Sequence, residues 1–287
     1  MSSAIRIGCV PEHFSAPLLH AVESGEFKDN EIELVICKLG TGDMVKKLAA
    51  GELDVAICVT EGLVAGINSN KDASLRLFGT YVDTPLPWAV SVATDARFCS
   101  LDDLGFGAKF GISRPGSGSE VMARYAASQY EWATPQFAVL GDINQLVAGT
   151  QEHKVDAFLW ERTTMQRHYT AESVRYLGTV KPPWPAFSYG ATEQFIRRNP
   201  GLLRDLIARI GQVAGRFMER REEGLRFVCD SLGYAAEDAV MWAGYVGFSP
   251  DGAVDEAKVR AVARALQRAA VIGDCALEDI VLRPGQA

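Results

Sequence analysis

Apolar and polar positions alternate along the first third of the chain in a pattern that predicts strands and helices in turn. Short apolar runs bounded by glycine, proline or acidic residues predict strands, whereas apolar residues spaced three or four apart predict helices. The expected strands are 5–10, 32–38, 55–59, 75–82 and 88–93, and the expected helices are 16–26, 43–50 and 61–68. This alternation is typical of an α/β protein with mainly parallel sheets flanked by helices.

The middle of the chain repeats this plan. In the passage 48–57 a helix is expected to end at Gly51 and a strand to open with Asp54. The passage 146–159 has Gly149 and Asp156 in the corresponding places, at the end of a helix and the start of a strand. The similarity of the two passages predicts two lobes of like construction.

Two segments rich in proline and tryptophan, 84–92 and 181–187, bracket the second series. Proline lacks an N–H group and favours extended backbone, which suits crossings between lobes. We therefore expect a discontinuous first lobe, 1–88 with 187–287, a second lobe, 93–182, and a cleft between them. Trp88, Trp184 and Phe187 are then expected near the hinge, and the alternative is that these rings only fill the surface between the lobes.

The last hundred residues are expected to be helical. Asn199 and Pro200 are typical of the start of a helix. The apolar positions after them fall on one helical face, and a second apolar face follows Asp255. These faces comprise Leu203, Leu206, Ile207, Ile210, Val213, Ala214 and Phe217 in the first stripe, and Val259, Val262 and Leu266 in the second. We expect both stripes to be core that packs back on the first lobe.

Composition narrows the function classes. A net charge of −7 without a basic run argues against nucleic acid as a partner. No apolar run approaches the ~18 residues of a membrane span, so membrane insertion is not expected. The start enters a strand without a leader, which predicts a cytoplasmic protein as written, and a periplasmic one only if a leader has been removed. Three of the six cysteines, Cys9, Cys37 and Cys58, lie in apolar runs and are expected to be buried thiols.

The most informative stretch is the glycine- and serine-rich passage 109–122. A short strand with Phe110 and Ile112 is expected to break into a loop, from which a helix leaves near Ser119 or Glu120 and runs to Ala127. Backbone N–H groups at such a helix start can bind a carboxylate, sulfonate or phosphate. The expected ligand residues of this loop are Ser113, Arg114, Ser117, Gly118 and Ser119. The alternative is an ordinary helix cap, and for Arg114 a solvated side chain.

Spacing excludes three other interpretations of this loop. A dinucleotide fingerprint needs a glycine where Val121 stands, and a P-loop needs a lysine followed by serine or threonine. A nucleophile elbow needs glycines two residues before and after the serine, and neither Ser113 nor Ser117 has both. The loop is therefore expected to bind and not to react.

Other candidate ligand residues follow the carboxyl ends of the expected strands, where open parallel sheets bind their ligands. They comprise acidic and polar residues at three strand ends, aromatic residues that suit a planar or apolar group, and one further acid: Glu12, His13, Phe14, Thr41, Gly42, Thr60, Glu61, Tyr81, Trp88, Trp160, Glu161 and Trp184. Glu161 is expected to meet a cationic or N–H-rich group such as an amino-pyrimidine. Its alternative is a surface salt bridge with Arg162 or Arg167.

Three passages carry a resemblance to a known family: Leu48–Ile57, the lead-in Ser100–Gly105 and the loop Gly111–Ser119. Together with the order of elements, they resemble the type II periplasmic-binding-protein-like superfamily, in its SsuA/THI5-like or NMT1-like branch. The passage Val155–Thr164 further resembles unexported members from fungi and bacteria. The resemblance implies two lobes that close by a hinge on a small molecule, with Ser117, Gly118 and Ser119 facing Thr41 and Gly42.

Two functions remain open at this point. The first is non-catalytic binding of a thiamine-pyrimidine precursor, a sulfonate or a similar polar or anionic molecule. The second is an enzyme of thiamine-pyrimidine or related cofactor biosynthesis on the same fold. The clustered cysteines that the resemblance implies for such synthases are missing, and the four histidines, His13, His20, His153 and His168, lack metal-ligand spacing. We therefore favour binding, expect no metal or cofactor, and leave open a transporter or downstream enzyme as partner.

Overall fold

The structure is a computed structural model that describes residues 4–27 and 32–286. These residues form two compact units. Unit 1 takes the described parts of Met1–Thr84, Trp184–Ala263 and Asp274–Ala287, and unit 2 takes Pro85–Pro183 and Arg264–Gly273. Residues 264–273, which the sequence places with the first lobe, thus cluster with unit 2. The outermost ends of the expected first lobe, 1–3 and 287, lie outside the described residues.

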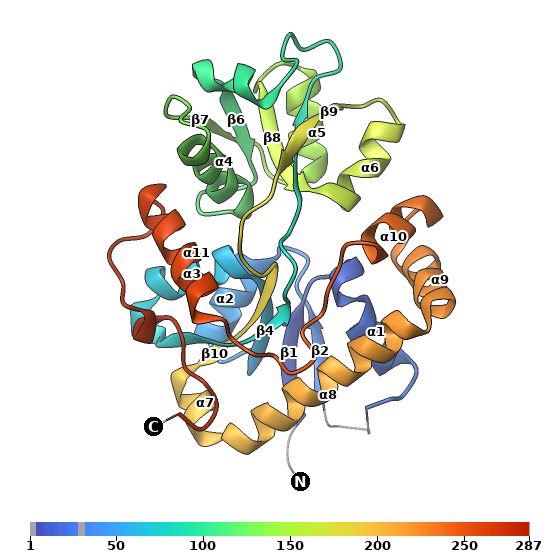
Figure 1. The fold of residues 1–287 in the computed structure, drawn as a ribbon, viewed down its shortest axis with the longest axis vertical. Helices are drawn as coiled ribbons and strands as arrows, with labels where there is room; N and C mark the ends of the chain where they lie inside the picture. The colour runs from blue at the N-terminus through green and yellow to red at the C-terminus, as the bar shows by residue number, and fades with distance from the viewer. Residues whose placement is uncertain (1–3, 28–31, 287) are drawn as a thin grey trace. The chain divides into compact units, whose positions relative to one another are not determined.

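Unit 1 contains a five-stranded sheet in the order β2-β1-β3-β10-β4. Its strands are β1 (Ile5–Cys9), β2 (Ile32–Ile36), β3 (Val55–Val59), β4 (Leu75–Val82) and β10 (Phe187–Thr192). β1 pairs in parallel with β2 and β3, whereas β10 runs antiparallel to β3 and β4 between them. The helices that connect these strands are α1 (Ala16–Glu23), α2 (Thr41–Ala49) and α3 (Thr60–Ser69), with short 3-10 turns η1 (His13–Ser15) and η2 (Lys71–Ala73) (Figure 1).

Unit 2 contains a second five-stranded sheet in the order β7-β6-β8-β5-β9. Its strands are β5 (Trp88–Val92), β6 (Lys109–Ile112), β7 (Gln136–Val139), β8 (Ala157–Glu161) and β9 (Arg175–Val180). β6 pairs in parallel with β7 and β8, and β5 runs antiparallel to β8 and β9. Its helices are α4 (Gly118–Gln129), α5 (Ile143–Gln151) and α6 (Arg162–Thr170), with the 3-10 turn η3 (Leu101–Phe106).

The expectation of mainly parallel sheets flanked by helices is confirmed, with one antiparallel strand in each. β5 and β10 are those strands. β5 confirms the expected strand 88–93 to within one residue, and it lies inside the segment 84–92 that the sequence also treats as a crossing. A run of five residues after two prolines does not reveal which sheet it joins, because strand pairing is a long-range choice.

The internal similarity seen in the sequence corresponds to the same contact in both units. The Asp54 N–H donates to the Arg6 carbonyl at 3.0 Å, and the Arg6 N–H donates back to the Asp54 carboxylate at 2.9 Å. Asp156 and Lys109 exchange the same two bonds at 2.8 and 2.7 Å. In each unit this aspartate ties the start of one strand to its neighbour. One detail of the similarity is wrong: α5 continues past Gly149 to Gln151.

The C-terminal part is helical, as expected. It comprises α7 (Glu193–Arg198), α8 (Pro200–Glu219), α9 (Arg221–Leu232), α10 (Ala236–Ala243), α11 (Glu256–Arg268) and the turn η4 (Leu277–Asp279). All seven apolar residues of the expected stripe on α8 are buried, and so are the three on α11. α8 packs against α1 and α9 within unit 1. Among the described residues, no helix is both long and apolar enough to span a membrane.

Candidate functional site

The start of α4 is built by a tight turn that follows β6. The Ser117 N–H donates to the Arg114 carbonyl at 3.1 Å, with Pro115 and Gly116 between them. Gly116 has φ +73°, which is the third-position geometry that a type II turn requires, and proline suits the second position. The sequence Arg-Pro-Gly-Ser therefore fixes where the helix begins. α4 starts at Gly118, one residue before the expected Ser119.

This helix start is not capped by a side chain. Ser117 is the N-cap residue, but its hydroxyl makes no cap bond. It lies 2.9 Å from the Ser119 hydroxyl, which also accepts the Ser113 N–H at 3.2 Å. The first N–H groups of an α-helix have no acceptor within the helix. The first turn of α4 therefore presents backbone donors together with two hydroxyls that are about 97% buried.

Two other helices of unit 2 are capped in the ordinary way. The Asp142 carboxylate accepts the Gln145 N–H at 3.0 Å at the start of α5, in a capping box. The Glu161 carboxylate accepts the Thr163 and Thr164 N–H groups at 2.9 and 2.7 Å at the start of α6. Because acidic caps neutralise the positive end of a helix, α5 and α6 are closed to an anion in a way that α4 is not.

Trp88 lies against the start of α4. A side-chain carbon added at Gly118 would come within 2.6 Å of the Trp88 ring, so only glycine allows this approach. Trp88 is 6% exposed, and its indole N–H is buried without a hydrogen-bond acceptor. A buried donor without a partner costs free energy unless a ligand or water accepts from it. Trp88 thus touches the helix start through Cη2 and Cζ2 of its six-membered ring, and the same indole carries a buried N–H without an acceptor.

The acid in the first turn of α4 is already paired. Glu120, in the first turn of α4, accepts the Gly116 N–H at 2.8 Å and forms an ion pair with Arg124 at 2.8 Å. Its charge therefore does not dominate the helix start. Arg114, half-buried, lies in the turn itself.

Two expected ligand residues of unit 2 are engaged within the unit. Glu161 is 6% exposed and serves as the N-cap of α6, also accepting the Thr164 hydroxyl at 2.9 Å. Its carboxylate is thus bound at this helix start, and its role as a ligand residue stays a prediction. Trp160 packs against a cluster that includes Phe158, Met165 and Leu146, so its ring fills the helix-covered side of the sheet.

In unit 1, the expected residues of α2 and α3 lie at two further helix starts. Neither helix has a side-chain cap, and Gly40, before Thr41, has φ +72°. The Thr41 hydroxyl accepts the Val59 N–H at 3.0 Å, and Gly62 of α3 packs directly on the Thr41 side chain. Thr41 and Gly42 are half-buried. Thr41 thus ties the start of α2 to the end of β3.

Thr60, Glu61 and Trp184 are almost completely buried, with at most 1% exposure. The Trp184 indole N–H donates to the Glu61 carboxylate at 3.0 Å. The hydroxyls of Thr60 and Ser188 lie 2.8 Å apart. Ser188 carried no sequence signal, because a lone serine in a strand is indistinguishable from any other.

The remaining expected residues of unit 1 belong to its core. Phe14 and Tyr81 are 1% exposed, and the Tyr81 hydroxyl donates to the Phe14 carbonyl at 2.8 Å. Burial raises the pKa of Tyr81 well above its ordinary value. His13 is fully buried, with Nδ1 2.8 Å from the Tyr234 hydroxyl and its ring edge-on to Trp242. Glu12 is half-buried next to it. Phe14 and Tyr81 thus pack inside unit 1, and their role as wall residues for a ligand stays a prediction.

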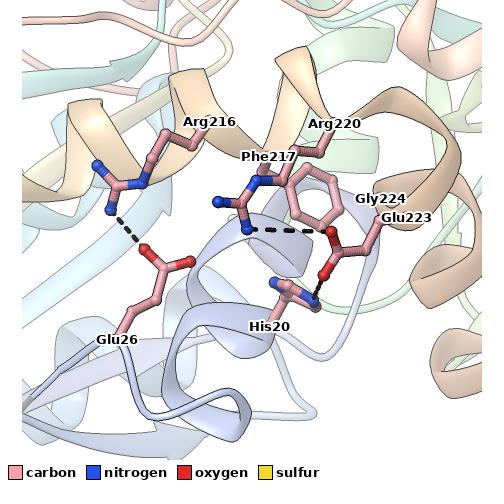
Figure 2. Close-up of a pocket in the computed structure, with 7 residues that line it drawn as sticks. All are labelled: His20, Glu26, Arg216, Phe217, Arg220, Glu223 and Gly224. Atoms are coloured by element: carbon pink, nitrogen blue, oxygen red, sulfur yellow. Dashed lines mark hydrogen bonds and ion pairs between the residues drawn. The ribbon is translucent and has the colours of Figure 1, made fainter.

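A small hollow with a volume of about 10 Å³ lies between α1, α8 and α9 in unit 1. Figure 2 shows that its charged side chains point toward one another. Glu26 pairs with Arg216, and Glu223 lies 3.3 Å from His20 and 3.9 Å from Arg220. Because the acidic side chains of the hollow are already paired with basic ones, we interpret it as a gap between packed helices and not as a ligand site.

The three buried cysteines are poor candidates for a reactive centre. Cys9, Cys37 and Cys58 are buried, as expected, whereas Cys99 is exposed and Cys229 and Cys275 are partly exposed. Burial raises the pKa of the Cys9 thiol to about 12. Such a thiol remains protonated at neutral pH and is a poor nucleophile. No group of three metal-ligating side chains occurs in 4–27 and 32–286.

Comparison with known proteins gives one family match and several structural ones. Residues 88–180 match the family model described as Ca3427-like PBP. The chain is similar to the Candida albicans CA3427 gene product, described as defining a new family with the generic periplasmic binding protein structural fold. The two share 26% identity over 98% of this chain and 96% of that one, with a TM-score of 0.89.

Two sulfonate-binding proteins are also similar in structure. The periplasmic aliphatic sulphonate binding protein SsuA from Escherichia coli is 16% identical, with a TM-score of 0.74 over 100% of this chain and 94% of that one. The alkanesulfonate-binding protein SsuA from Xanthomonas axonopodis pv. citri, bound to MOPS, is 14% identical, with a TM-score of 0.81 over 98% and 99% of the two chains. A comparison with curated protein sequences gives no match.

Proposed function

Because this chain has the type II periplasmic-binding-protein fold, we propose that it binds a small anionic molecule at the start of α4. The observation that carries the proposal is the uncapped first turn of α4, against which the Trp88 ring packs. The indole N–H of this ring is buried without an acceptor. Backbone N–H groups, hydroxyls and an indole are all hydrogen-bond donors. Donors gathered at the positive end of a helix favour the oxygens of a carboxylate, sulfonate or phosphate over an amine.

The two hydroxyls can supply one more hydrogen-bond donor to this site. Ser119 already accepts the Ser113 N–H, and its own proton can go to the Ser117 oxygen 2.9 Å away. In that arrangement the Ser117 proton points onward to a ligand oxygen. In this chain of hydrogen bonds, Ser117 contacts the ligand, and Ser119 orients the Ser117 hydroxyl.

A sulfonate is the first class to test, because two proteins with this fold are sulfonate-binding proteins. An amino-pyrimidine has less support, since the acid expected to meet it, Glu161, is used as the cap of α6. We therefore place thiamine-pyrimidine precursors, and an enzyme that would make them, second.

The test is a thermal-shift series on the full chain with MOPS, methanesulfonate, taurine, phosphate, acetate and an amino-pyrimidine. A ligand that binds only the folded state at about 100 times its Kd adds about 2.7 kcal/mol of stability, which raises the melting temperature by several degrees. We expect at least one anion to give this shift. Replacing both Ser117 and Ser119 by alanine should remove it.

Two further variants separate binding from stability. Gly118→Ala should also remove the shift, because the added carbon displaces Trp88 from the helix start. Asp142→Ala is the matched control: it removes a cap from α5, lowers the melting temperature, and should leave the ligand shift unchanged. The proposal fails if no anion stabilises the chain, or if the serine variants keep the full shift.

A further inference from the structure

Unit 1 holds both ends of the longer of the two excursions that the chain makes into unit 2. The chain leaves unit 1 after Thr84 and re-enters it at Trp184. Inside unit 1 these two ends are joined: the Ala186 N–H donates to the Thr84 carbonyl at 3.1 Å. Thr84 is further held by its hydroxyl, which accepts the Gly247 N–H at 2.9 Å.

The first turn of α3 is bonded to the same returning segment at three points. The Thr60 N–H donates to the Ala186 carbonyl at 3.0 Å, and the Thr60 and Ser188 hydroxyls lie 2.8 Å apart. The third point is the 3.0 Å bond from the Trp184 indole to Glu61. We call Thr60, Glu61, Thr84, Trp184, Ala186 and Ser188 the junction clasp.

The Glu61–Trp184 contact is unusual within the clasp because it places a carboxylate at 0% exposure. Burying a carboxylate is costly unless hydrogen bonds and nearby positive potential compensate. Here the indole donates to it, and Glu61 lies in the first turn of α3, where the helix dipole favours negative charge. Both features hold the Glu61 side chain in one orientation, and hence the Trp184 ring.

We propose that Glu61 is a positioning residue, which through Trp184 couples the first turn of α3 to the segment where the chain re-enters unit 1. Any ligand or substitution that displaces the start of α3 then acts on residues 184–188 as well. The segment in turn holds Thr84, so both chain passages respond together. This role does not depend on which molecule binds at α4.

The experiment is hydrogen exchange on the full chain, comparing the original with Glu61→Ala and Glu61→Gln. Losing the acceptor should raise exchange of the Thr60 and Ala186 amides by about tenfold, because their hydrogen bonds open together. Glutamine keeps an acceptor for the indole, so Glu61→Gln should stay within about threefold of the original. The Leu77 amide, which bonds to Ile280 elsewhere in unit 1, is the internal control and should not change.

Trp184→Phe tests the same bond from the other side, and serves if Glu61→Ala does not fold. It should raise exchange at Thr60 and Ala186 as Glu61→Ala does. Unchanged exchange at both amides would overturn the proposal. So would an equal rise at Leu77, since that would mean general loosening of unit 1 and no specific coupling.

Discussion

At the scale of single residues, the same aspartate contact in the two units differs in one respect. Asp54 and Asp156 each accept a backbone N–H from the neighbouring strand, from Arg6 of β1 and from Lys109 of β6. Only Arg6 adds a side-chain contact, with its guanidinium 2.8 Å from the Asp54 carboxylate. Burial raises the pKa of Asp54, but the bonds and charge of Arg6 outweigh it, and the net pKa is below the ordinary value.

Asp54→Asn should therefore lower stability in a pH-dependent way. A carboxyl whose pKa is lowered by folding stabilises the protein above its unfolded pKa of about 3.9, and this contribution disappears as the pH falls through the folded pKa. We expect a loss of about 1 kcal/mol at pH 7, discounted for the partly exposed Arg6, and a smaller loss at pH 3, which is below the unfolded pKa. Urea unfolding at both pH values measures it.

Asp156→Asn is the matched variant for this experiment. It changes the same backbone contact without an arginine partner, so its effect should be smaller at pH 7. Equal losses for the two variants, or a loss at Asp54 that is as large at pH 3 as at pH 7, would contradict the assignment to Arg6.

At the scale of elements, the helix starts of unit 2 divide into capped and uncapped ones. Asp142 and Glu161 cap α5 and α6, whereas the N-cap residue of α4 makes no such bond. A side-chain cap stabilises a helix, and α4 lacks this contribution. Forgoing a cap where serine is already in place is consistent with a helix start kept for a ligand.

Removing either cap should destabilise the protein by different amounts. We expect about 1 kcal/mol for Asp142→Ala and about 2 kcal/mol for Glu161→Ala, because Glu161 is nearly buried and accepts several bonds. Denaturant midpoints at constant slope measure both values. A Glu161→Ala variant as stable as the original would show that the cap does not contribute.

At the scale of the whole molecule, unit 1 is assembled from segments far apart in the sequence. These segments are held together by contacts such as the hydrogen bond from Trp184 to Glu61, two residues that are 123 positions apart in the sequence. Trp242 offers a matched comparison, because it is also fully buried in unit 1 but its indole N–H has no acceptor.

Trp184→Phe should therefore cost about 2 kcal/mol more than Trp242→Phe. Both variants lose ring volume, but only the first leaves a buried carboxylate without its indole donor. Urea unfolding of the two variants under the same conditions gives the difference. Equal losses would mean that the bond to Glu61 adds nothing to the stability of unit 1.

The sequence by itself determined the local elements and their class. The bounds of β3 and β4 agree with the apolar runs residue for residue, and the stripe on α8 is buried throughout. These features depend on periodicity and on glycine or proline at the ends, which act over a few residues. The serine-rich start of α4 was visible for the same reason.

Only the tertiary structure decided which polar residues are engaged with one another. Glu61 and Glu161 both follow a strand, yet one holds a tryptophan and the other caps a helix. Gly118 is next to Trp88 although thirty residues separate them, and β10 lies between β3 and β4. These are long-range pairings, and a local pattern does not specify its distant partner.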